Sequence, residues 1–307
     1  MTGYVKNGVY PTMLTPFTDD DKIDYNAVSQ LIEWYVSKGV DGIFAVCQSS
    51  EMFFLTFEER YELLNFIVHN VPKGISVVAS GHVCDDIDTA IYEAQKFSDL
   101  GIDGYVFISN RLAAKDESDD VLLRNVSAFM DALPRVDFGI YECPYPYKRL
   151  VSPRVMGELA RTGRFSFLKD TCCEPDLIRE KLNAVKGTNF KIFNANSATL
   201  LETLRFGCAG FSGVMANFHP EMYSWLCRHF EEEPEKAETL QAVLGFLSVA
   251  ERQIYPVNAK YYLKLEGLDI NIRSRSRNQK EFTLSARREI EQMHTLTQLL
   301  KAQFDII

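Results

Sequence analysis

Lys169 lies in a stretch whose other residues predict a buried β-strand. The segment Phe165–Thr171 reads F-S-F-L-K-D-T, with apolar side chains at Phe165, Phe167 and Leu168. Burial of an unpaired ammonium is costly, so it lowers the pKa of a lysine and favours the neutral amine. A neutral amine is a nucleophile toward carbonyl carbons. The alternative is a lysine at a strand end that extends its ammonium to water.

Two further groups follow predicted strands. Tyr141 ends the apolar stretch Val136–Tyr141, and the polar loop Cys47–Glu51 (C-Q-S-S-E) follows another strand. Neighbouring strands lie about 5 Å apart, so Tyr141 would approach Lys169 if the two strands are adjacent. A phenol can shuttle the protons that imine formation requires, and a hydroxyl-bearing loop can hold a carboxylate. The set indicates Schiff-base chemistry on a 2-oxo acid, although a core tyrosine with a satisfied hydroxyl is the alternative for Tyr141.

Eight strand-like segments alternate with helix-like segments in the first two thirds of the chain. The predicted strands are Gly8–Thr15, Val40–Val46, Ile75–Ser80, Asp103–Ile108, Val136–Tyr141, Phe165–Thr171, Phe190–Phe193 and Ala209–Val214. Asp24 is expected to cap one of the intervening helices, and Thr56 begins a capping box, T-F-E-E, in another. This pattern predicts an α/β fold, a (β/α)8 TIM barrel whose strand ends meet at one mouth. A doubly wound open sheet would need a glycine-rich phosphate loop after its first strand, and Pro11–Phe17 has none.

The remaining residues read as helices. Leu240–Ile254 and Leu284–Phe304 have apolar residues at helical spacing, and Pro256 and Ser274–Arg277 mark breaks. We therefore expect a barrel over residues 1–216 and a C-terminal helical extension over residues 217–307, packed on the barrel as a single structural unit.

Composition excludes several classes of function. The chain has 307 residues with a net charge of −9 and no basic patch, so a nucleic-acid partner is not expected. It has no secretory signal and no run of about 18 apolar residues, which predicts a cytoplasmic protein without a membrane partner. The cysteines and histidines lack the spacing of metal ligands, and no metal or cofactor is expected.

Several motifs occur in the order found in one known superfamily. The motif-bearing segments are Gly8–Phe17, Cys47–Arg60, Tyr141–Pro144 (Y-E-C-P), Leu168–Thr171 (L-K-D-T) and Gly207–Asn217. Together they resemble the dihydrodipicolinate synthase / N-acetylneuraminate lyase superfamily of pyruvate-dependent Schiff-base aldolases. The resemblance covers essentially residues 5–270.

The resemblance implies a role for each matching position. Lys169 would be the Schiff-base lysine and Tyr141 the proton carrier, while Gln48, Ser49 and Ser50 would hold the carboxylate of the 2-oxo acid. The further substrate-binding candidates are Asn194, Ser212 and His82; Asn194 and Asn196 suit sugar hydroxyls, and His82 is expected to face the mouth. Glu51 is expected to support the loop, Arg111 to bind an anion or a second subunit, and Arg273, Arg275 and Arg277 to be surface or interface charges.

Departures from the resemblance matter as much. Ser109–Leu112 stands where the synthases carry a second proton-relaying tyrosine, and Leu112 cannot relay a proton. Pro146 stands where they carry an arginine for the second substrate, so dihydrodipicolinate synthesis is not expected. Gln48 and Ser50 also replace smaller residues, which leaves open whether the 2-oxo acid is pyruvate.

These observations favour a lyase that cleaves or forms a C–C bond in a 2-oxo-3-deoxy acid, with pyruvate and an aldehyde as partners. A dehydratase of a keto-deoxy sugar acid, acting through the same imine, is the second hypothesis. The third is a non-catalytic protein that binds 2-oxo acids on an aldolase scaffold. The resemblance implies a homotetramer or homodimer.

Overall fold

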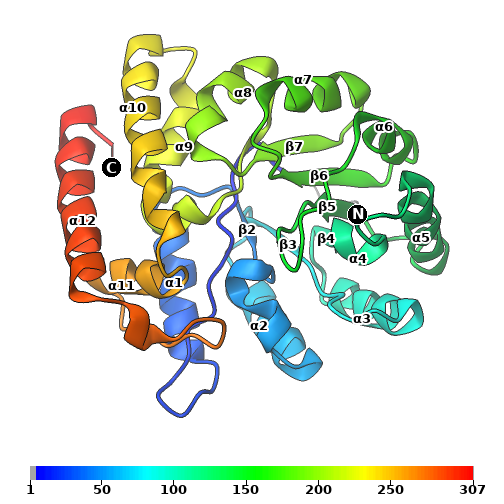
Figure 1. The fold of residues 1–307 in the computed structure, drawn as a ribbon, viewed down its shortest axis with the longest axis horizontal. Coiled ribbons are helices and arrows are strands. Elements are labelled where there is room, and N and C mark those ends of the chain that lie inside the picture. The colour runs from blue at the N-terminus through cyan, green and yellow to red at the C-terminus, as the bar shows by residue number, and fades with distance from the viewer. Residues whose placement is uncertain (1–4, 307) are drawn as a thin grey trace.

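Eight short parallel strands form the centre of the molecule, and helices surround them (Figure 1). A computed structural model describes residues 5–306. The strands are β1 (Gly8–Val9), β2 (Gly42–Phe44), β3 (Ser76–Ala79), β4 (Gly104–Ile108), β5 (Phe138–Tyr141), β6 (Phe165–Asp170), β7 (Lys191–Asn194) and β8 (Gly210–Phe211). They are hydrogen-bonded in the order β1-β8-β7-β6-β5-β4-β3-β2. The predicted (β/α)8 TIM barrel is confirmed.

The first strand is shorter than predicted. Pro11 has no N–H to donate, so the regular ladder of β1 stops before it. Pairing resumes as an isolated bridge between Thr12 and Phe44, where the Phe44 N–H donates to the Pro11 carbonyl and the Met13 N–H donates to the Phe44 carbonyl. This bridge closes the barrel between β1 and β2.

The helices begin where the sequence places their caps. The Asp24 carboxylate accepts from the N–H groups of Asn26 and Ala27, and Thr56 and Glu59 form both hydrogen bonds of the capping box. The helices around the barrel are α1 (Tyr25–Ser37), α2 (Phe57–Asn70), α3 (Ile87–Asp99), α4 (Ser109–Leu112), α5 (Asp119–Ala132), α6 (Pro153–Arg161), α7 (Pro175–Ala184) and α8 (Leu200–Phe206).

Aromatic rings fill the inside of the barrel. Phe167 packs between Tyr10, Phe44 and Phe193, with ring centroids 5.5, 5.8 and 4.7 Å away. Side chains two residues apart on a strand share a face, so Lys169 lies directly above Phe167. Gly139 makes room for this layer, because a Cβ there would lie 2.7 Å from the Phe167 carbonyl oxygen.

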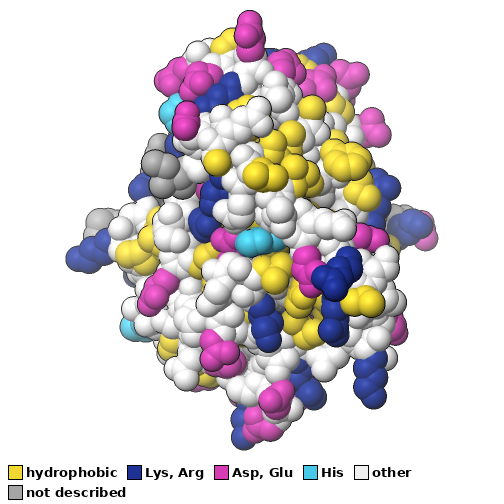
Figure 2. Space-filling view, turned by 90° about the vertical axis from the view of Figure 1, so that its left-hand side faces the viewer, with side chains coloured by type: hydrophobic (Ala, Val, Ile, Leu, Met, Phe, Trp, Pro, Cys, Tyr) yellow, Lys and Arg dark blue, Asp and Glu magenta, His cyan; other side chains and the backbone are white. Residues whose placement is uncertain are grey.

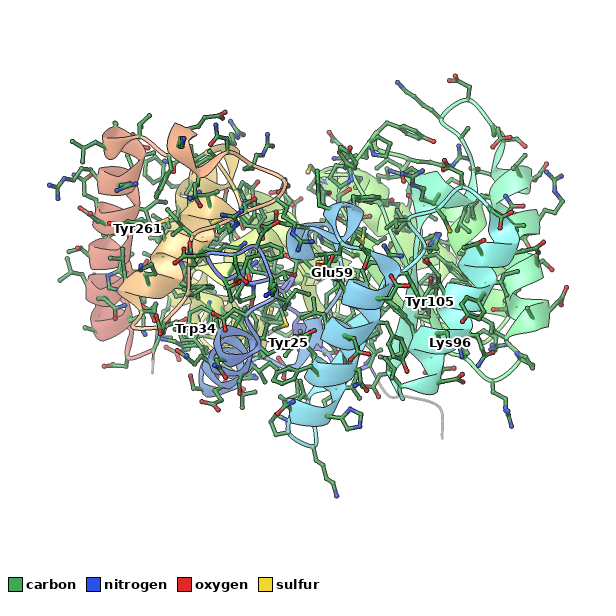
Figure 3. The ribbon with its side chains drawn as sticks, turned by 90° about the horizontal axis from the view of Figure 1, so that it is seen from below. Tyr25, Trp34, Glu59, Lys96, Tyr105 and Tyr261 are labelled. Atoms are coloured by element: carbon green, nitrogen blue, oxygen red, sulfur yellow. The ribbon has the colours of Figure 1, made fainter. Side chains whose placement is uncertain are left out.

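The C-terminal helices pack on one side of the barrel, next to α1 (Figure 1). They are α9 (Pro220–His229), α10 (Pro234–Leu247), the 3₁₀ turn η5 (Ser248–Arg252), α11 (Val257–Leu265) and α12 (Leu284–Phe304). The predicted helix Leu240–Ile254 is therefore wrong at both ends, since α10 begins at Pro234 and the chain turns at η5 before Pro256. Trp34 of α1 faces this side (Figure 3) and donates its indole N–H to Glu266 at 3.2 Å.

The face formed by these helices carries mixed charges around a group of apolar side chains (Figure 2). Phe246 of α10, Val249 of η5 and Leu299 of α12 are each more than half exposed. None of the described helices is long and apolar enough to cross a membrane. Formation of a homodimer or homotetramer stays a prediction.

A buried ion pair joins the extension to the barrel. The Lys260 ammonium of α11 lies 2.9 Å from the Glu51 carboxylate, and both side chains are almost fully buried. Although burial alone would raise the pKa of Glu51, Lys260 lowers it.

Lys260→Met should lower the free energy of unfolding by about 3–5 kcal/mol, because the buried Glu51 carboxylate loses its cation. Urea unfolding of the variant and the unmutated protein measures this loss.

Because the pair joins the extension to the barrel, we expect one cooperative unfolding transition of the unmutated protein in urea. Circular dichroism and the fluorescence of Trp34 and Trp225 would follow it. Two separated transitions in the unmutated protein would contradict a single structural unit.

Candidate active site

Lys169 and Tyr141 lie side by side at the carboxyl ends of β6 and β5. The two residues are directly opposite each other in the parallel ladder. The Lys169 Nζ lies 4.2 Å from the centroid of the Tyr141 ring. The expected approach of the amine and the phenol is therefore present in the structure.

The Lys169 amine is buried without an anionic partner among the described residues. Its side chain is 4% exposed and contacts the face of Tyr141 in place of a carboxylate. Burial lowers the pKa of Lys169, and the nearby thiols of Cys47 and Cys143 and the carboxylate of Glu251 only partly oppose this effect. The Lys169 side chain therefore does not extend into bulk solvent and instead lines a cavity.

A buried ion triad accounts for the two acids beside these residues. Glu142 and Asp170 follow Tyr141 and Lys169 in the chain, so they point to the opposite face, toward α7. The Lys181 ammonium of α7 lies 2.5 Å from each carboxylate, and all three side chains are fully buried. Against the effect of burial, the two carboxylates raise the pKa of Lys181.

Gln48 connects the strand-two loop to the tyrosine. The Tyr141 hydroxyl donates to the Gln48 Oε1 across 3.4 Å, a long hydrogen bond, and the Cys143 thiol donates to the same oxygen across 3.5 Å. Burial raises the pKa of Tyr141 well above its usual value, so the phenol is protonated. The Gln48 side-chain oxygen is thus the hydrogen-bond acceptor for the phenol that lies beside the amine.

Ser49 and Ser50 differ in their surroundings: only Ser49 lines the cavity. Ser49 lines the cavity above Lys169 and donates its hydroxyl to Thr12 Oγ1 at 3.0 Å. Ser50 is fully buried, and its hydroxyl is occupied by the carbonyls of Met13 and Ala45. The structure therefore does not place the Ser50 side chain where it can hold a substrate carboxylate.

Two other candidates are committed to the protein interior. The Asn194 side chain donates to the hydroxyls of Thr199 and Thr203 and accepts from the Asn196 N–H. Ser212 donates its hydroxyl to the Tyr10 carbonyl at 3.0 Å. Neither side chain is among those that line the cavity, whereas Asn196 is.

The expectation that His82 faces the mouth is wrong. Its ring packs against Tyr105, Phe107 and Phe129, and its Nε2 accepts from the Ile108 N–H at 2.7 Å. Burial lowers the pKa of His82 to about 3, so the ring is neutral. This histidine supports the end of β4.

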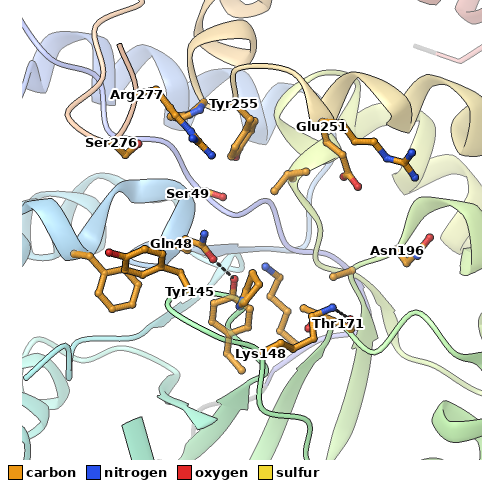
Figure 4. Close-up of a pocket in the computed structure, with 18 of the residues that line it drawn as sticks. Gln48, Ser49, Tyr145, Lys148, Thr171, Asn196, Glu251, Tyr255, Ser276 and Arg277 are labelled. Carbon is orange, nitrogen blue, oxygen red and sulfur yellow. Dashed lines mark hydrogen bonds between the residues drawn. The ribbon is translucent and has the colours of Figure 1, made fainter. Parts of the chain in front are cut away.

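The cavity above Lys169 has a volume of about 490 Å³, and the C-terminal extension forms its far wall (Figure 4). The residues of the extension that line it are Glu251, Arg252, Tyr255, Pro256, Ser276 and Arg277. Sequence reasoning missed Glu251, Arg252 and Tyr255, although Pro256 signalled that the chain turns there. Aromatic rings line the outer part, and Phe53 and Tyr145 pack with centroids 4.9 Å apart.

Arg277 lines the cavity and is also exposed to solvent, as expected for a surface charge. Arg275 pairs with Glu59 at 2.8 Å and Arg273 pairs with Asp21 at 2.7 Å. Glu59 lies at the N-terminal end of α2 (Figure 3). Arg277 has no acidic partner within the described part of the chain, and Figure 4 shows its guanidinium directed into the cavity.

The loop that carries Gln48 also fixes the segment that carries Arg277. The Glu51 Oε2 accepts from the Ser274 hydroxyl and from the N–H groups of Arg275 and Ser276. The expected supporting role of Glu51 is confirmed. Its carboxylate holds the segment that carries Arg277 against the loop that carries Gln48. Arg111 pairs with Asp85 and lies over the Phe53 ring.

No group of three or more potential ligands in residues 5–306 has the geometry of a metal site. The chemistry that the cavity presents is an amine, three phenols, a carboxylate and several cations.

The chain matches the profile of the Dihydrodipicolinate synthetase family over residues 6–293 and belongs to this family. The 4-hydroxy-tetrahydrodipicolinate synthase of Clostridium perfringens (strain SM101) is 26% identical over 242 residues, which are 78% of this chain and 79% of that protein. The protein of the same name from Methanosphaerula palustris is 26% identical over 228 residues, 73% of this chain and 76% of its own length.

Solved structures share the fold. The sialic acid aldolase of Ruminococcus gnavus has a TM-score of 0.86 and 19% identity, covering 97% of this chain and 99% of that chain. YagE of E. coli K12, solved in complex with pyruvate, has a TM-score of 0.84 and 21% identity, covering 98% and 99%.

Lys181→Met should destabilise the protein by about 3–5 kcal/mol, because it leaves Glu142 and Asp170 buried without a cation. Adding Glu142→Gln should recover part of the loss, since it removes one of the two charges. Urea unfolding of the single and double variants measures both effects. Lys186→Met, at an exposed position nearby, is the matched control; equal stability of the two lysine variants would contradict the role of the triad.

Proposed function

We propose that this protein is a Schiff-base-forming lyase that acts on a 2-oxo acid, with Lys169 as the nucleophile. The observation that carries the proposal is a buried lysine with a lowered pKa, unpaired by any described carboxylate and in contact with a phenol at the base of a cavity. Burial costs free energy that a structural lysine would recover through an ion pair, as Lys181 does.

Imine formation uses groups that are already in place. The neutral Lys169 amine adds to the C2 carbonyl carbon, and the former carbonyl oxygen leaves as water once it has been protonated. Tyr141 donates a proton to that oxygen and recovers one afterwards, with Gln48 holding the phenol in position. The product is an iminium that can accept an electron pair.

The cavity wall suits an acid. Lys148, Arg252 and Arg277 line it along with Lys169, against one carboxylate, in a chain with 42 acidic and 33 basic residues. Gln48, Ser49 and Arg277 would hold the carboxylate next to C2. Ser50 would support the loop from below, and Asn194, Ser212 and His82 would support the strand ends.

We propose a 2-oxo-3-deoxy acid as the substrate, cleaved to pyruvate and an aldehyde. The C3–C4 bond breaks, its electron pair forms the C2–C3 double bond of an enamine, and the iminium pair moves to nitrogen. The C4 hydroxyl gives its proton to water in the cavity, and C4 becomes the carbonyl carbon of the aldehyde. The enamine takes a proton at C3, and water releases pyruvate from Lys169. The pyruvate bound by YagE and the name of the Ruminococcus gnavus aldolase support this choice.

Synthesis of dihydrodipicolinate, the activity named for several relatives, is not favoured. Leu112 is buried at the position of the second relay tyrosine, and Pro146 carries no cation. Tyr255 offers a second phenol from the extension instead: it accepts from the Asn217 side chain at 3.0 Å, and hydrogen bonds tie it to Ser49 and Thr12.

Pyruvate with borohydride should add one covalent mass at Lys169, because hydride reduces the iminium to a stable amine. Peptide mass spectrometry locates the label. Lys169→Ala should abolish it, and Tyr141→Phe should slow its formation about 100-fold if the phenol carries protons. A Lys148→Ala variant, which changes another lysine of the cavity, should still be labelled. An unlabelled wild-type protein would contradict the proposal and favour a non-catalytic binding protein.

The labelling rate should rise with pH and reach its plateau below the pKa of an ordinary lysine. Only the neutral amine attacks, and burial lowers the pKa of Lys169. The neutral amine therefore becomes the main form at a lower pH than it does for an ordinary lysine. Initial rates measured across a pH series check this. A rise centred at the pKa of a free lysine would contradict the assigned environment.

Screening 2-oxo-3-deoxy sugar acids should distinguish an aldolase from a dehydratase that uses the same imine. We expect release of pyruvate, detected with a coupled reductase, and no release with Lys169→Ala. A dehydrated 2-oxo acid without pyruvate would overturn the aldolase assignment and leave the imine chemistry intact.

A further inference from the structure

Glu251 supplies the one carboxylate among the described residues that line the cavity. It comes from η5, at the point where the chain leaves α10. Figure 4 shows its side chain entering the cavity from the side opposite Gln48. The proposed imine chemistry described so far makes no use of it.

The turn that carries Glu251 is held in place. The Asn258 side chain of α11 donates to the Ala250 carbonyl at 2.8 Å, and the Gln253 N–H donates to the same oxygen at 3.1 Å. Asn258 is itself fully buried. The backbone beside Glu251 is therefore held in place.

The charges around Glu251 come from several elements. Lys169 reaches the cavity from β6, Arg252 follows on the same turn, and Lys148 and Arg277 lie on the other walls. Burial raises the pKa of Glu251, and Lys169 and Arg252 partly oppose this. The raised pKa makes the carboxylate a stronger base than an ordinary glutamate, and its side chain remains accessible from the cavity.

Tyr141 and Tyr255, two of the three tyrosines that line the cavity, are poorly suited to accept a proton. Burial raises the pKa of both Tyr141 and Tyr255 well above that of a free phenol. Their hydroxyls are therefore proton donors at neutral pH. The thiol of Cys143, beside Tyr141, has its pKa raised to about 11 by burial.

We propose that Glu251 is the base that removes a proton from C3 of the Lys169 iminium and, as the acid, returns it. This inference rests on the proposed function. The C3–H electron pair forms the C2–C3 double bond, the iminium pair moves to nitrogen, and Glu251 becomes the neutral acid. Reversal of these steps protonates the enamine after C–C cleavage.

Exchange of the pyruvate methyl protons in D₂O tests this step without knowledge of the aldehyde. Loss of the methyl signal is followed by NMR, and the occupancy of the imine is measured in parallel by borohydride trapping. Glu251→Gln should lower the exchange rate per imine at least about 100-fold, as expected for loss of a general base. Glu251→Asp should recover part of the rate, while Glu232→Gln, at an exposed glutamate outside the cavity, should change nothing.

The pH profile separates a base from a purely electrostatic role. Exchange per imine should fall as pH drops through the pKa of Glu251, and this fall should be absent in Glu251→Gln. Arg252→Gln should move it to higher pH, because Arg252 lowers that pKa.

Each failure has a different meaning. If imine is trapped and Glu251→Gln exchanges at the wild-type rate per imine, the role of Glu251 is overturned and the proposed function stands. The role of Glu251 is also overturned if Glu251→Gln forms less imine and its exchange rate falls by the same factor, because the rate per imine is then unchanged. If the wild-type protein forms no imine with pyruvate, the proposed function fails and this inference falls with it.

Discussion

The separation of Lys169 from the two acids beside it in the chain is the constraint on which the site depends. A buried amine stays reactive only if no carboxylate holds it as an ammonium. Asp170 and Glu142 are close in sequence, but the alternation of side chains along β6 and β5 turns them to the outer face. There the Lys181 ammonium neutralises much of their charge, 2.5 Å from each. The Lys181 ammonium thus binds the two acids that could otherwise pair with the Lys169 amine.

The second constraint is the attachment of the extension to the barrel. Glu51 ends the loop that carries Gln48 and Ser49, and its carboxylate binds Lys260 and the backbone that leads to Arg277. The turn before Pro256 brings Glu251 and Tyr255 to the same cavity. The base of the site comes from the barrel and its far wall from the extension, so the extension belongs to the chemistry of the cavity.

The two parts of the cavity differ in how the backbone holds them. The amine and the phenol lie on adjacent strands whose register is set by backbone hydrogen bonds. The groups that would meet the rest of the substrate lie on turns and on the extension, where side chains can change without disturbing the barrel. Tyr255 and Arg277 bring a phenol and a cation to the cavity from this part of the chain.

The sequence by itself determined the barrel, its strand order along the chain, the helix caps at Asp24 and Thr56, and the pairing of Lys169 with Tyr141. These follow from local periodicity and from the rule that strand ends of a parallel barrel meet at one mouth. It could not place Ser50, Asn194 and His82, because a polar side chain near a strand end can face substrate or bond to its own backbone. Only the tertiary structure decided this, and only it brought Glu251 and Arg277 to Lys169. Contacts between segments some 80 to 110 residues apart leave no periodic signal in a single sequence.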